Sequence, residues 1–77
     1  MEQELLDFGS ALQLLRGGDR MSRVGWNGPG QFIELQRPDQ HSKMTKPYLY
    51  ITTVQRDRVP WLASQTDLLA EDWYIVE

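Results

Sequence analysis

One stretch of the chain has the apolar spacing of a helix, and this stretch limits the folds that the rest can join. Its apolar side chains fall at positions i, i+3, i+4 and i+7, namely Phe8, Ala11, Leu12 and Leu15. Asp7 stands where an N-cap carboxylate accepts free backbone N–H groups. Gly17 stands where a left-handed residue usually ends a helix. The sequence therefore predicts a helix over residues 8–16.

The remaining chain has the pattern of short strands separated by turns. Alternating or β-branched stretches predict strands at 20–25, 31–36, 48–54, 58–62 and 73–76. Asn27-Gly28 is a strong hairpin signal because both residues tolerate positive φ, and Pro29-Gly30 lengthens the turn. We therefore expect Trp26 and Asn27 at the tip of the first hairpin. Residues 37–46 predict an irregular loop, and a tight turn is expected at 55–57.

A second, shorter helix is predicted before the last strand. Ser64 and Asp67 fit a capping box, in which each residue bonds the backbone of the other, and the helix would continue through Leu68, Leu69 and Ala70. The fold class is therefore α+β: an N-terminal helix, a mostly antiparallel sheet of about five short strands, and a short helix before the last strand. We expect one domain, residues 1–77.

Size and composition exclude several classes of site and partner. The 77 residues contain no cysteine and one histidine, so disulfides, thiolate zinc sites and histidine metal clusters are excluded. A domain this small gains stability by associating with copies of itself, so we expect a homo-oligomer. The net charge of −3 argues against a duplex nucleic-acid partner.

No feature of the sequence indicates a membrane or an exported protein. Apolar runs stay well short of the ~20 residues that a membrane span needs. The first four residues, Met1-Glu2-Gln3-Glu4, include two acidic side chains and no basic one, whereas a signal peptide is basic before its apolar stretch. We therefore expect a cytosolic protein.

The inventory of reactive side chains gives little support to catalysis. Ser64 lacks the context of a nucleophile elbow, and His41 has no partner that can be placed. Asp67, Glu71 and Asp72 form an acidic group that could hold a metal or act as paired carboxylates. Asp67 as a cap, with Glu71 and Asp72 as solvated surface, is the favoured interpretation. We predict no enzyme activity, no catalytic residue, no metal and no cofactor.

Binding is better supported, because aromatic side chains accompany polar ones. The stretch from Val59 to Trp73 holds two of the three tryptophans. Composition alone favours Trp61 and Trp73 as core residues. Trp26 is less easily assigned to a core, and an exposed aromatic beside an amide is a platform on which a base can stack.

Five groups of residues form a series of motifs over about residues 7–76. They are Phe8-Gly9-x-Ala11-Leu12-x-Leu14-Leu15, Val24-Gly25-Trp26-Asn27-Gly28, Ser42-Lys43-Met44-Thr45 with Pro47-Tyr48, Pro60-Trp61-x-x-Ser64-x-x-Asp67, and Asp72-Trp73. In this order and at this family-like spacing, the motifs resemble the second family of Thoeris anti-defence proteins of phages.

The resemblance implies a sponge, which sequesters a signal without cleaving it. The ligands of such proteins are the cyclic ADP-ribose isomers that bacterial TIR-domain proteins make as an alarm. The resemblance also implies a homotetramer with pockets between subunits, acting in the cytoplasm of the infected host. Some members also bind guanine-containing cyclic dinucleotides in a separate pocket; for this chain that second activity is an open question.

For such a ligand we expect stacking on tryptophan, polar groups that read ribose hydroxyls or the base edge, and arginines for the phosphates. The candidate ligand residues are Trp26, Asn27, Trp61, Ser64, Gln65, Asp67, Arg23 and Arg58. Backbone N–H groups of the turn at 28–30 are further candidates for the phosphates. Two alternatives stay open: a phosphodiesterase or glycohydrolase that uses Asp67, Glu71 or Asp72, and a single-strand nucleic-acid-binding module.

Overall fold

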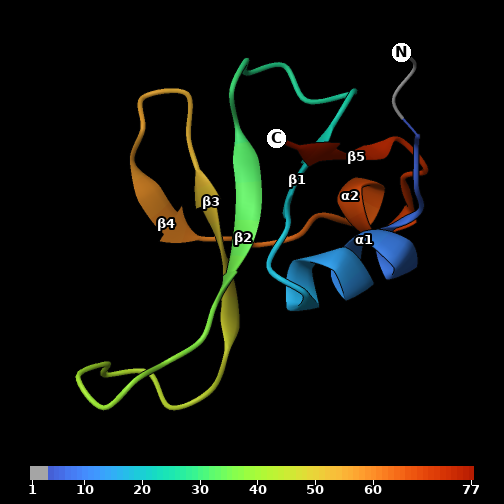
Figure 1. Cartoon of the computed structure of the whole chain (residues 1–77). Helices are drawn as coiled ribbons and strands as arrows, with labels where there is room; N and C mark the ends of the chain where they lie inside the picture. Colours follow the sequence, from blue (N-terminus) through green and yellow to red (C-terminus); the bar gives the residue numbers. More distant parts are fainter. Residues whose placement is uncertain (1–3) are drawn as a thin grey trace.

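The computed structural model describes residues 4–77 and has the predicted α+β architecture (Figure 1). Five antiparallel strands form one sheet in the order β4-β3-β2-β1-β5. A short helix precedes the last strand, as expected. The elements in chain order are α1 (Phe8–Arg16), β1 (Arg20–Arg23), β2 (Phe32–Gln36), β3 (Tyr48–Thr52), β4 (Arg58–Pro60), α2 (Gln65–Leu69) and β5 (Trp73–Val76).

Helix α1 begins and ends at the predicted residues, but the left-handed residue after it is not the expected one. The carboxylate of Asp7 accepts the backbone N–H of Ser10 at 2.8 Å, which confirms the N-cap. The expectation that Gly17 is left-handed is wrong: its φ is −84°, and Gly18 has a φ of +103°. The N–H groups of Gly18 and Asp19 bond back to carbonyls of the last helical turn. This pattern is a Schellman motif, shifted by one residue because either glycine can take the left-handed position.

The loop from β1 to β2 is longer than a two-residue hairpin turn, as predicted, but its conformation differs. Neither Asn27 nor Gly28 has positive φ; Gly30 does, at +77°. At Gly28 an added Cβ would overlap with Nε2 of Gln31 and with Cγ2 of Val54, so close packing favours glycine there. Asn27-Gly28 therefore marks a close approach between two loops.

β5 spans the predicted residues and the other four strands are shorter than predicted; their registers place the core on one sheet face. Met21 pairs with Ile33 and with Ile75, so these side chains share a face. Helices α1 and α2 lie beside each other near β1 and β5 (Figure 1). The core consists of the fully buried Ala11, Leu15, Met21, Ile33 and Trp73.

Two features at the periphery complete the fold. Leu6 exchanges two backbone hydrogen bonds with Trp73, so the chain ahead of α1 covers part of the β5 edge. The loop 37–47 extends away from the helices (Figure 1).

None of the helices in residues 4–77 is long and apolar enough to cross a membrane. The sequence predicts no signal peptide. Residues 1–3, on which that prediction depends, lie outside the described part of the chain.

Leu15→Ala tests the importance of this core. The Leu15 side chain is fully buried, so its truncation should lower the free energy of unfolding by about 2–5 kcal/mol. Urea denaturation at neutral pH measures the change. Leu69→Ala is the matched control, because Leu69 is 78% exposed and its truncation should change stability by less than about 0.5 kcal/mol. Equal losses in the two variants would contradict the assigned core.

Candidate ligand-binding site

The three tryptophans, which come from three separate segments, meet in one cluster with Phe8. The ring centroids of Trp26 and Trp73 lie 5.3 Å apart, and those of Trp61 and Trp73 lie 5.9 Å apart. The interplanar angles are 79° and 87°, so ring edges meet ring faces, which is a favourable geometry for aromatic pairs. We call Phe8, Trp26, Trp61 and Trp73 the tryptophan cluster.

Only two of the tryptophans keep surface that a ligand can reach. Trp73 is completely buried, and its indole N–H donates to the backbone carbonyl of Asp67 at 3.1 Å. Trp26 and Trp61 are half-buried and pack against the core. The expectation of an exposed Trp26 at a hairpin tip is therefore wrong, because the ring folds back over Trp73. Trp26 and Trp61 each combine a packed side with a solvent-facing side.

Asp67 lies at the centre of the polar part of the site. The predicted capping box is present: Ser64 Oγ accepts the N–H of Asp67 at 3.0 Å, and Asp67 Oδ2 accepts the N–H of Ser64 at 3.2 Å. The other oxygen, Oδ1, accepts Nη1 of Arg23 at 2.8 Å and the indole N–H of Trp26 at 3.0 Å. Asp67 is only 8% exposed. Its carboxylate therefore joins α2, β1 and the loop that carries Trp26.

Arg23 is bound by a second carboxylate, which the sequence did not indicate. Its Nε donates to Oδ1 of Asp72 at 2.8 Å, and its Nη2 donates to Oδ2 at 3.4 Å. The expectation that Asp72 is solvated surface is wrong, whereas Glu71 is exposed as expected. No local pattern signals this pair, because 49 positions separate the two residues in the sequence.

The pKa values of these groups shift toward their charged forms. Hydrogen bonding to Asp72 is the largest cause that raises the pKa of Arg23, and the same contact lowers the pKa of Asp72. Burial acts to raise the pKa of Asp67, but hydrogen bonds from Trp26 and Arg23 outweigh burial and hold it below its ordinary value. All three groups are therefore charged at neutral pH.

The remaining candidate residues divide into two groups. Asn27 and Gln65 are exposed and follow directly after Trp26 and Ser64, so they lie at the rim of the cluster. Arg58 lies elsewhere: it is on β4, where it pairs with Thr52 of β3, and it lines a small hollow of about 160 Å³ with Tyr48 and Tyr50. The structure thus brings seven of the eight predicted residues to one region, and Arg58 is the exception.

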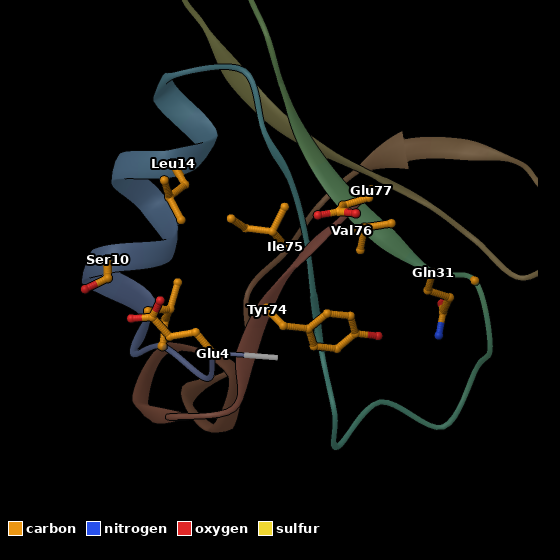
Figure 2. A pocket seen from close by; sticks show the side chains of 10 residues that line it. Glu4, Ser10, Leu14, Gln31, Tyr74, Ile75, Val76 and Glu77 are labelled. Carbon is orange, nitrogen blue, oxygen red and sulfur yellow. The ribbon is translucent and has the colours of Figure 1, made fainter. Parts of the chain in front are cut away.

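A larger cavity, of about 830 Å³, lies between α1, β5 and the start of β2 (Figure 2). It is lined by Glu4, Leu6, Ser10, Leu14, Gly30, Gln31, Tyr74, Ile75, Val76 and Glu77, none of which was a candidate ligand residue. Its one aromatic side chain is Tyr74, and its charged side chains are both glutamates, whereas the tryptophan cluster offers two accessible rings. The tryptophan cluster is therefore the better candidate site for an aromatic nucleotide.

The acidic residues of this region do not have the arrangement of a metal site or a catalytic pair. Within residues 4–77, no group of three His, Cys, Asp or Glu side chains is placed to hold a metal ion. Asp67 and Asp72 are both bound to Arg23, which lies between them. Both carboxylates are therefore engaged in ion pairs with the same arginine.

The lowered pKa values of Asp67 and Asp72 predict a loss of stability in acid. A folded pKa below the unfolded value of about 3.9 means that the stabilisation is complete above that pH and is lost as the pH falls through the folded values. The free energy of unfolding in urea should therefore decrease as the pH falls from about 4 toward 2. Asp72→Asn should show a smaller decrease, because one of the titrating groups is gone. An identical decrease in both proteins would contradict the assignment.

Comparison with known proteins agrees with the motifs of the sequence. The model of the Thoeris anti-defense 2-like domain family matches residues 6–76. The protein named Thoeris anti-defense 2 of Bacillus phage SP01 is 34% identical over 84 aligned residues, which cover 92% of this chain and 94% of that protein. Membership of this family supports an anti-defence role. This chain belongs to the Thoeris anti-defense 2-like family.

Proposed function

We propose that this protein is a sponge that binds cyclic ADP-ribose isomers made by TIR-domain proteins and holds them without cleaving them. The observation that supports this most is the tryptophan cluster itself. Within a domain matched along residues 6–76 by an anti-defence family, it presents two half-buried tryptophans beside polar side chains. Stacking on such rings is worth about 1–3 kcal/mol per base.

The proposal assigns a role to each part of the site. Trp26 and Trp61 stack on the adenine through their solvent-facing sides. Asn27, Ser64 and Gln65 at the rim donate to or accept from ribose hydroxyls and the base edge. We expect a nanomolar affinity, which corresponds to a standard free energy of binding of about −12 kcal/mol and to slow release of the signal. We further propose a homotetramer, because a pocket between preassembled subunits loses little order on binding.

The polar groups of the site favour sequestration over hydrolysis. An enzyme that cleaves this ligand needs a free carboxylate or an activated nucleophile near the scissile bond. Asp67 and Asp72 are instead bound to Arg23 at 2.8 Å each. A carboxylate so engaged is a weak base, since its pKa is lowered.

A heat-release assay tests sequestration. Protein incubated with a cyclic ADP-ribose isomer should remove the ligand from an ultrafiltrate, and heat denaturation should return it with unchanged mass and retention time. A guanine-containing cyclic dinucleotide, run in parallel, tests the second ligand class. Recovery of ADP-ribose in place of the cyclic compound would show hydrolysis and support the enzyme alternative. Binding of a single-stranded oligonucleotide with steep salt dependence would support the nucleic-acid alternative.

Asn27→Ala tests the location of the site. Asn27 is exposed, so its truncation should leave the thermal midpoint unchanged. Loss of one hydrogen bond to the ligand should weaken binding about two- to tenfold in calorimetry. Gln13→Ala, an exposed change on α1, is the matched control and should bind as the wild type does. Unchanged binding by Asn27→Ala would place the ligand away from this rim.

A further inference from the structure

Asp72 holds three consecutive residues at the end of β1. Its carboxylate accepts Nε of Arg23 through Oδ1 and the backbone N–H of Gly25 through Oδ2, each at 2.8 Å. Its backbone carbonyl accepts the N–H of Val24 at 3.2 Å. One residue ahead of β5 therefore fixes the exit of a strand that lies 47 to 49 positions earlier in the sequence.

The fit around this carboxylate is tight. A Cβ added to Gly25 would lie 3.0 Å from Nη2 of Arg23 and 3.1 Å from Oδ2 of Asp72, which is closer than ordinary van der Waals contact. Both carboxylate oxygens accept from donors that face them. An asparagine at this position has only one oxygen, so it can accept from either Arg23 or Gly25. Its NH₂ group, which is itself a donor, must then face the other one, whichever way the amide is turned.

The contacts of Asp72 continue to the ring that is proposed to stack on the ligand. Trp26 follows Gly25 directly, and its backbone N–H donates to the carbonyl of Arg23 at 3.3 Å. Its indole N–H shares Oδ1 of Asp67 with Nη1 of Arg23. Asp72, Arg23, Asp67 and Trp26 thus form one continuous chain of hydrogen bonds.

We infer that Asp72 is a positioning residue of the ligand site. It acts through Arg23 and Gly25, which set the path of the loop that carries Trp26 and Asn27, and it is not itself a ligand contact. Charge-assisted hydrogen bonds of this kind are stronger than neutral ones, and a shell that orients contacting groups governs affinity. The inference rests on the proposed function, because the affected quantity is capture of the nucleotide.

The test compares Asp72→Asn with Glu71→Gln, which removes the same charge from the exposed neighbouring residue. Two quantities are measured: the Kd for a cyclic ADP-ribose isomer, and hydrogen exchange at the Gly25 amide and the Trp26 indole without ligand. Asp72→Asn should weaken binding on the order of tenfold and accelerate both exchange rates. Glu71→Gln should match the wild type in both measurements.

A double-mutant cycle with Arg23→Gln separates positioning from general loss of stability. If Asp72 acts through Arg23, the double variant should have about the same affinity as whichever single variant binds the ligand less tightly. If the two residues act independently, the losses of binding free energy would add. Should Asp72→Asn fail to fold by circular dichroism, Gly25→Ala replaces it. This change keeps both charges and places a methyl group against the carboxylate, so it should also weaken capture, by a smaller factor.

The outcomes distinguish this inference from the function on which it rests. If the wild type captures the ligand and both Asp72→Asn and Gly25→Ala capture it equally well, the positioning role alone would be overturned. Additive losses in the cycle would overturn it as well. Absence of capture by the wild type would overturn the proposed function and this inference together.

Discussion

One buried carboxylate determines how the elements of this domain meet. A buried charge is costly unless donors surround it, and Asp67 has donors from three segments: Arg23 of β1, Trp26 of the next loop, and the N–H of Ser64. Its backbone carbonyl also accepts the indole N–H of Trp73. Helix α2 has only five residues and would not be stable alone. Its position, and with it the position of the tryptophan cluster, depends on these bonds.

The core and the candidate site share the same aromatic residues, which is a consequence of size. A chain of 77 residues buries only about 60% of its unfolded surface, so few side chains are available for the interior alone. Trp73 fills the interior completely, while Trp26 and Trp61 pack one side inward and keep the other in solvent. Under the proposed function, truncation of Trp26 or Trp61 therefore perturbs stability and ligand contact together. Exposed rim residues such as Asn27 separate the two effects more cleanly.

The sequence predicted those features whose cause is local. Apolar spacing and a carboxylate cap were sufficient for α1, and the capping box of Ser64 and Asp67 was sufficient for the start of α2. Features that depend on distant partners were missed. The ion pair of Arg23 with Asp72 and the pairing of Leu6 with Trp73 arise only when the sheet has formed. The same limit affected Trp26, because its burial depends on rings from other segments.

The charges of the site constrain how a cyclic nucleotide can lie on it. Arg23 carries one positive charge and is bound by two carboxylates, so the trio of Arg23, Asp67 and Asp72 has a net negative charge. A pyrophosphate is repelled there, whereas an adenine ring is not. Under the proposed function the base therefore faces the tryptophans and the phosphates lie beyond the rim. The loop at 28–30, which follows Asn27 in the chain, has backbone N–H groups at Gly28 and Gly30, and Arg56, whose Nη1 donates to the carbonyl of Gly30 at 3.1 Å, adds a positive charge beside it.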